Sequence, residues 1–185
     1  MTTRRFFGRR PSTWKTRQQR STSGSASPLP KKFTKSEGLD TATGRQAARR
    51  EEREVLEELQ RRASLALGGD NEQLEAEPDA IQLPAEQIEQ GGVIVAELDD
   101  RIAGFAAVLI EDDHAELDGL FVEPDLWRKG IGAALIDVAV HTARQQGLAM
   151  MVVANPSAQE FYEKCGFTVE GKAETRFGPA LRMSR

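Results

Sequence analysis

The segment WRKGIGAAL, residues 127–135, concentrates groups that could bind phosphate. Arg128 and Lys129 precede Gly130 and Gly132, and the apolar residues that follow predict a helix. The first turn of a helix exposes main-chain N–H groups without helical partners, and the helix dipole adds partial positive charge there. Glycine lets a ligand approach the main chain closely. The segment therefore predicts a site for two linked phosphates.

Two known nucleotide motifs do not account for this segment. A P-loop requires the pattern G-x-x-x-x-G-K-[ST], which the chain lacks. A dinucleotide-binding turn requires a third glycine at the position of Leu135. The competing interpretation is an ordinary helix start with two loop glycines.

Residues suited to acid–base chemistry lie on both sides of the phosphate segment. Tyr162 is the only tyrosine of the chain. His114, Glu116 and Asp118 alternate along a predicted strand, so their side chains should leave the same face. A carboxylate can accept a proton and a phenol can donate one. The alternatives are a solvated strand face and a core-edge tyrosine with its hydroxyl in water.

Periodicity predicts the elements that must position these residues. A charged helix should begin near residue 44 and end at Gly68-Gly69, with one apolar face formed by Val55, Leu56, Leu59, Ala63 and Ala66. Three strands should follow at 93–98, 102–110 and 114–122, with a tight turn at Asp99-Asp100. The rest of the chain predicts a helix at 132–146, a strand at 148–154 buried on both faces, a helix from 155 to Gly166, and two short strands. The fold class is α/β (α+β), with a mixed, largely antiparallel sheet and helices on both faces.

Two segments carry a resemblance to a known family. LDGLFVEPDLWRKGIGAALI resembles the acyl-CoA-binding segment of the GNAT-type N-acetyltransferase superfamily, and ANPSAQEFYEKCGF resembles that superfamily's second signature. The resemblance implies a strand that splays from its neighbour, beside which the pantetheine arm of acetyl-CoA pairs like an additional strand. The residues it implies for the cosubstrate are Leu120, Phe121, Val122, Trp127, Arg128, Lys129, Gly130, Ile131, Gly132, Ala133 and Asn155.

The resemblance also implies a reaction. Acetyl-CoA would be the cosubstrate, and an amine, on a small molecule or on a protein, would attack it directly in a ternary complex. Tyr162 would protonate the departing thiolate, and Glu116 or Asp118 would act as the base. The acidic region from Asp70 to Glu89 favours a cationic acceptor. The alternative is a non-catalytic module that binds acyl-CoA and serves regulation or interaction.

The chain departs from the family pattern at two places. The family has Gln or Arg where this chain has Trp127. The family also has a strand before its first helix, and the segment FTKSEGLDTA is a poor strand. We expect cosubstrate binding to tolerate the first departure, because main-chain N–H groups supply most of the phosphate contacts. The second departure leaves the N-terminal edge of the sheet undefined.

Composition separates the chain into two parts. Residues 1–35 carry ten of the 25 Lys and Arg residues and no acid, which leaves the other 150 residues with all 29 acids and a net charge of −14. We predict a disordered basic tail at 1–43 and a GNAT-like acetyltransferase domain at 44–185. The tail is solvated, is a transit peptide, or contacts nucleic acid or an acidic partner.

The remaining expectations concern location and partners. The single cysteine, Cys165, fits a reducing compartment, and we interpret it as a packing residue. No apolar run approaches the ~20 residues that span a bilayer. We therefore expect a cytoplasmic protein, or an organellar one if the tail is a transit peptide, without membrane contact. We expect no metal site, because the EDDH segment indicates a charged turn. The oligomeric state, including a homodimer, stays open.

Overall fold

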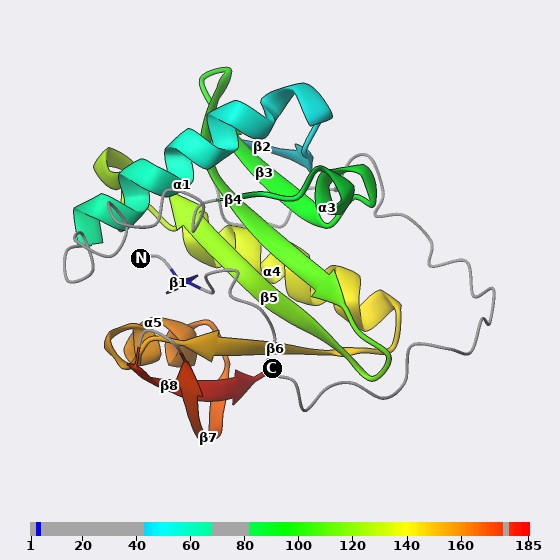
Figure 1. Ribbon diagram of the computed structural model, residues 1–185, viewed down its shortest axis with the longest axis vertical. Helices are drawn as coiled ribbons and strands as arrows, with labels where there is room; N and C mark the ends of the chain where they lie inside the picture. Colours follow the sequence, from blue (N-terminus) through cyan, green and yellow to red (C-terminus); the bar gives the residue numbers. More distant parts are fainter. Residues whose placement is uncertain (1–2, 5–42, 68–81, 176–177) are drawn as a thin grey trace.

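The computed structural model describes residues 3–4, 43–67, 82–175 and 178–185 (Figure 1). Most of the predicted tail and most of the acidic region between Asp70 and Glu89 lie outside the described residues. The elements, in chain order, are β1 (Thr3–Arg4), β2 (Thr43–Ala47), η2 (Arg50–Glu52), α1 (Arg53–Leu67), α3 (Ala85–Glu89), β3 (Val93–Leu98), β4 (Arg101–Ile110), β5 (His114–Val122), η4 (Pro124–Leu126), α4 (Ile131–Gln145), β6 (Ala149–Ala154), η5 (Pro156–Ala158), α5 (Gln159–Lys164), β7 (Thr168–Thr175) and β8 (Gly178–Ser184).

The strands form one mixed sheet in the order β2-β3-β4-β5-β6-β8-β7, and β1 adds to β5. All neighbouring strands in the described residues are antiparallel except β5 and β6, which run parallel. The parallel pair needs a crossover connection, and α4 provides it. This architecture confirms the predicted fold class.

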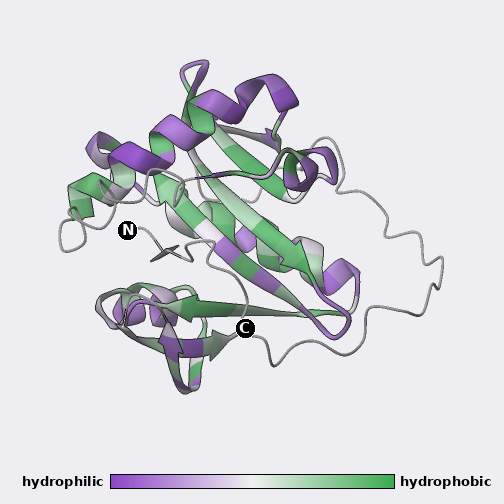
Figure 2. Ribbon diagram, viewed as in Figure 1, coloured by the Kyte–Doolittle hydropathy of each residue, from purple (hydrophilic) through white to green (hydrophobic). Residues whose placement is uncertain are grey.

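Two apolar layers cover the two faces of the sheet. Helices α4 and α5 pack on one face, where Leu135, Ile136 and Tyr162 are fully buried. Helices α1 and α3 pack on the other face, where Leu56 and Leu59 are fully buried. The ribbon coloured by hydropathy shows β3, β4 and β6 as mostly apolar, whereas β5 carries hydrophilic residues along part of its length and so does the hairpin of β7 and β8 (Figure 2). No helix of the described residues is both long enough and apolar enough to cross a membrane.

The hairpin between β3 and β4 turns at Asp99 and Asp100, as the sequence predicts. Their φ angles are 51° and 59°. Positive φ at both central residues is the geometry of the two-residue turn that matches the twist of antiparallel strands. Short polar side chains such as Asp tolerate this conformation better than most residues do. The adjoining strands have the predicted bounds to within one residue.

The sequence-based prediction was wrong at the N-terminal edge of the sheet. Residues Thr43–Ala47 form β2, which pairs antiparallel with β3, instead of opening the first helix. The strand that the family has before its first helix is therefore present. The open edge of β3 provides the hydrogen-bonding partners, and this tertiary pairing overrides the weak strand propensity of TGRQA. The helix begins only at Arg53, after the 3₁₀ turn η2.

Two further predictions about burial were wrong. Val55 is 51% exposed, and Ala66 is also exposed. The buried side of α1 is centred between Leu56 and Ala63, and Val55 lies about 100° around the helix from Leu56. Strand β6 is fully buried only at alternate residues, and Met151 is half-buried. Among the described helices, α4 packs against β6 and covers only one face of that strand.

We predict that Asp100→Gly stabilises the fold by about 0.5–1 kcal/mol, because glycine adopts a positive φ without the steric penalty of a Cβ atom. Asp112→Gly is the matched control, since Asp112 lies in the next turn and has no positive φ. Thermal unfolding of the two variants and the parent measures the difference. Equal melting temperatures for both variants would contradict the turn geometry.

Candidate active site

The sheet opens into a wedge between β5 and β6. The parallel pairing of these strands runs from His114 opposite Ala149 to Glu116 opposite Met151 and then stops. Strand β5 continues to Val122, and the two ribbons diverge from this point (Figure 1). The main-chain groups of β5 that face the wedge therefore have no ladder partner on β6. This is the splayed strand that the resemblance implies.

A β-bulge lies just inside the wedge. Ala107 of β4 is opposite Gly119 of β5, whereas the next residue, Val108, is opposite Leu117. Asp118 is therefore the extra residue of the bulge. A bulge reverses the alternation of side chains, so residues before and after it that would share a face no longer do.

The bulge determines which residues of β5 face α1. Leu117 and Leu120 both pack on the α4 face. A Cβ atom on Gly119 would lie 2.8 Å from the ring of Phe121, which packs on the α1 face. Glu116 and Asp118 are thus left on the α1 face, as their spacing predicts.

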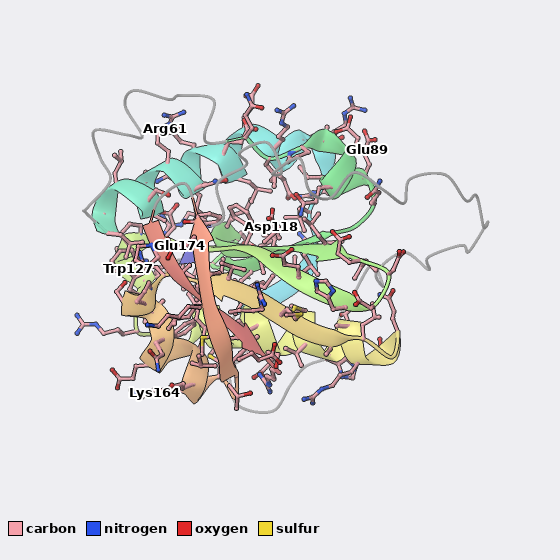
Figure 3. All side chains as sticks on the ribbon, turned by 60° about the horizontal axis from the view of Figure 1, so that its bottom comes forward. Arg61, Glu89, Asp118, Trp127, Lys164 and Glu174 are labelled. Carbon is pink, nitrogen blue, oxygen red and sulfur yellow. The ribbon has the colours of Figure 1, made fainter. Side chains whose placement is uncertain are left out.

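Both carboxylates are largely removed from water. Glu116 is 8% exposed and Asp118 is 6% exposed, and both interact with other groups. The view with side chains shows Asp118 in the interior, beneath α1 (Figure 3). Glu116 is at the apex of the wedge, where the parallel pairing ends, and Asp118 is two residues farther along β5. His114 is near the turn, where it contacts Asp113.

The edge of β5 that faces the wedge presents the main-chain groups of Leu120 and Val122. The N–H of Glu123 donates to the carbonyl of Ala103 in β4, at 2.9 Å. Since successive strand residues direct their N–H and C=O groups to alternate sides, those of Val122 and Leu120 point away from β4. The indole Nε1–H of Trp127 donates to the carbonyl oxygen of Val122 at 2.8 Å, which agrees with this direction.

Helix α4 begins beside this edge without a side-chain cap. Its N-cap residue, Gly130, has a φ of 81°. The first hydrogen bond of the helix runs from the N–H of Ala134 to the carbonyl of Gly130. The N–H groups of Ile131, Gly132 and Ala133 precede that bond and have no helical partner. A Cβ on Gly132 would lie within 3.8 Å of Leu120, Val122 and Phe161, so the helix start, β5 and α5 meet there.

The loop before α4 contains a strained residue. Arg128 has a φ of 64°, which is uncommon for a residue with a long side chain. Such a conformation costs on the order of 1 kcal/mol and persists where the surrounding structure requires it. Arg128 and Lys129 are both exposed, so their charges are available at the start of α4.

Asn155 is exposed at the start of η5. Its side-chain oxygen accepts hydrogen bonds from the N–H of Ser157 at 2.9 Å and from the Ser157 hydroxyl at 2.8 Å. Among the described residues, its side-chain NH₂ group donates no hydrogen bond. The oxygen therefore caps the turn, and the NH₂ group can serve a ligand.

Tyr162 is completely buried, with an exposed fraction of 0%. Its ring makes edge contacts with Phe161 and Phe167 at centroid distances of 5.2 and 5.4 Å. Its hydroxyl has no hydrogen-bond partner among the described residues. Burial raises the pKa of the phenol well above its usual value of 10.0, and Cys165 adds to the shift. The phenol therefore retains its proton near neutral pH. The alternative interpretation, a core-edge tyrosine with its hydroxyl in water, does not hold.

The sequence analysis missed two polar residues on α1. Gln60 is 7% exposed and Ser64 is 1% exposed, and α1 packs on β5. The Ser64 hydroxyl has no partner in the described part of the chain. The sequence does contain a signal for them, because Gln60 and Ser64 are four residues apart and therefore lie together beside the apolar face of the helix. Together with Glu116 and Asp118, they place buried polar groups on the α1 face.

Two other predictions concern residues outside this cluster. Burial raises the pKa of the Cys165 thiol, which disfavours the reactive thiolate and agrees with a packing role. The described residues contain no group of three or more potential metal ligands.

Comparison with known proteins links this geometry to one family. The model of the acetyltransferase (GNAT) family matches residues 53–167. An uncharacterised N-acetyltransferase of Methanocaldococcus jannaschii is 32% identical over 90 residues, which are 43% of this chain and 40% of that protein. A peptidyl-lysine N-acetyltransferase of Salmonella typhimurium is 38% identical over 76 residues, which are 40% of this chain and 48% of that protein.

A solved structure shows the same fold. The PaiA N-acetyltransferase of Thermoplasma acidophilum, crystallised with coenzyme A, matches with a TM-score of 0.65 and 22% identity. The match covers 78% of this chain and 99% of that one. The chain spans about half the length of the curated relatives it matches.

We predict that Tyr162→Phe leaves the free energy of unfolding unchanged or raises it by about 1 kcal/mol, because it removes a buried hydroxyl without a partner. The gain should grow as the pH rises above 10.0, where the unfolded phenol ionises and the buried phenol stays neutral. Phe167→Tyr is the reverse control, which should lower stability by burying a new hydroxyl at a position 2% exposed. Denaturant unfolding at two pH values tests this. A clear loss of stability in Tyr162→Phe would mean that the hydroxyl has a partner.

Proposed function

Because the chain belongs to the acetyltransferase (GNAT) family, we propose that it transfers the acetyl group of acetyl-CoA to an amine in a ternary complex. The observation that carries the proposal is the meeting of the uncapped start of α4 with the edge of β5 that β6 leaves unpaired. The first offers N–H groups for phosphates, and the second offers main-chain groups for an extended arm. Ordinary helix starts have no such neighbour.

The pyrophosphate of the cosubstrate would bind at the start of α4. The N–H groups of Ile131, Gly132 and Ala133 are oriented by the helix, and its dipole favours an anion. Gly130 keeps the approach free of a side chain, while the exposed Arg128 and Lys129 add charge. The indole N–H of Trp127 already donates to the carbonyl of Val122 at the end of β5, so the phosphates would bind without it.

The pantetheine arm would follow the edge of β5. The main-chain groups of Leu120 and Val122 would be its pairing partners, with the NH₂ group of Asn155 as a further donor. Phe121 lies between these two residues with its side chain on the α1 face and its main chain paired with Phe105 of β4, so its contribution would be to hold the strand in place. The uncapped helix start and the unused amide of Asn155 fit such a ligand.

The reaction requires two proton transfers by this chain. Acetyl-CoA supplies an acetyl group joined to sulfur, and the amine nitrogen forms the new bond as the carbon–sulfur bond breaks. Glu116 or Asp118, on the α1 face, would accept the proton that the amine loses, directly or through water. The neutral phenol of Tyr162 would donate a proton to the departing sulfur.

The acceptor would reach the wedge from the α1 face, where the buried carboxylates are. Two carboxylates favour a cationic amine, and the buried hydroxyl of Ser64 offers a further polar contact. The Salmonella relative is named for acetylating peptidyl lysine, which supports a protein amine as one acceptor class. A small cationic amine is the other class that fits the same charges.

We predict that Gly130→Glu raises the dissociation constant of coenzyme A about tenfold or more, because a carboxylate would enter the phosphate site. Gly147→Glu is the matched control at the other end of α4. It also has a positive φ, 75°, and a Cβ there meets nothing within 4 Å. Calorimetry should show weak binding for the first variant and parental binding for the second. Equal affinities would exclude the helix start as the phosphate site.

We predict that Tyr162→Phe lowers turnover on the order of a hundredfold while the coenzyme A affinity changes little. Of Glu116→Gln and Asp118→Asn, the variant that lacks the base should lose turnover by a similar factor, and the other should lose much less. Thiol release from acetyl-CoA with a panel of amines and peptides, and mass spectrometry of the acetylated products, provide the measurement. If the parent binds coenzyme A but acetylates none of them, a non-catalytic binding module replaces this proposal.

A further inference from the structure

The wedge between β5 and β6 contains a segment of the chain itself. Strand β1 pairs antiparallel with β5, with Thr3 opposite Leu120 and Arg4 opposite Gly119. It also lies against β6, so it is between the two diverging strands (Figure 1). Two residues from the extreme N-terminus thus reach the centre of the sheet.

The position of β1 coincides with the edge proposed for the cosubstrate. The main-chain groups of Leu120 point away from β4 into the wedge, and Thr3 is their register partner. The carbonyl of Val122 already accepts the indole N–H of Trp127. An N–H group donates to one strong acceptor at a time, so the N–H of Leu120 cannot serve β1 and an extended ligand together.

We propose that the N-terminal strand competes with acetyl-CoA for the wedge, so that cosubstrate binding requires displacement of β1. The proposal rests on the proposed function and names a regulation of that same site. The pairing is intramolecular, which gives the strand a high effective concentration at β5 without a second molecule. It is also short, and a two-residue strand offers too few hydrogen bonds to be permanent.

Charge favours the same arrangement. Residues 1–35 carry ten cations and no acid, whereas the rest of the chain has a net charge of −14. Opposite net charges attract each other, which favours the pairing of β1 with β5. Acetyl-CoA is anionic and residues 1–35 are basic, so the bound cosubstrate and the displaced N-terminal residues attract each other. Two states, closed by β1 or filled by cosubstrate, are therefore both compatible with the charges.

The test uses the full chain with Thr3→Pro and Arg4→Pro combined. Proline has no N–H and does not fit a ladder, so β1 should leave β5. The chain contains the same dipeptide at Thr16-Arg17, and Thr16→Pro with Arg17→Pro is the matched control, because it makes the same change in charge and composition. Calorimetric titration with coenzyme A needs no acceptor and no turnover.

If the wedge is closed most of the time, the apparent dissociation constant equals the intrinsic value divided by the open fraction. We expect the variant at positions 3 and 4 to bind coenzyme A about tenfold more tightly than the parent. We expect the variant at positions 16 and 17 to bind like the parent. A synthetic peptide of residues 1–8 should weaken binding to the first variant, and a scrambled peptide should not.

The outcomes separate this inference from the proposed function. Equal affinities for the parent and the variant at positions 3 and 4 would overturn the competition while leaving the transferase proposal intact. An equal gain in coenzyme A affinity in both proline variants would also overturn the competition, since the effect would then not depend on β1. Failure of all three proteins to bind coenzyme A would remove the proposed function and this inference together.

Discussion

Strand β5 has main-chain groups that its neighbour β6 does not pair, and the rest of the site follows from that constraint. Its parallel neighbour pairs only as far as Glu116, whereas the strand continues to Val122. Buried N–H and C=O groups need partners, because an unpaired one costs as much as a lost hydrogen bond. The indole of Trp127 serves one carbonyl, and β1 serves the groups of Leu120. An edge that needs partners is also an edge on which an extended ligand can compete.

The bulge at Asp118 complements the open edge. Without it, strict alternation would direct Glu116, Asp118 and Leu120 to a single face. With it, the carboxylates face α1 while Leu120 packs against α4. One inserted residue therefore separates the polar side of the wedge from the apolar side that holds α4 and α5. Under the proposed function, this separation would place the proton acceptor, Glu116 or Asp118, on one face of the sheet and the proton donor, Tyr162, on the other.

Much of the fold could be predicted because local signals agree with the tertiary structure there. The Asp99-Asp100 turn, the strands around it and the glycine start of α4 each follow from short-range rules. Strand β2 could not be predicted, because TGRQA forms a strand only when the edge of β3 pairs with it. The bulge depends on the register with β4, and the role of Trp127 depends on a free carbonyl five residues earlier. Sequence periodicity carries no information about either.

Departures from ordinary structural preference concentrate around the wedge. Arg128 has a strained main chain, α4 has no side-chain cap, and the hydroxyl of Tyr162 is buried without a partner among the described residues. Each would be relieved by a simple substitution, and stability alone would favour that substitution. Under the proposed function, these departures are of the kind that a binding site retains at the expense of stability. Among the described residues β1 pairs only the edge of β5, and neither the first N–H groups of α4 nor the hydroxyl of Tyr162 has a partner there. Under the proposed function, the cosubstrate would supply partners that β1 does not.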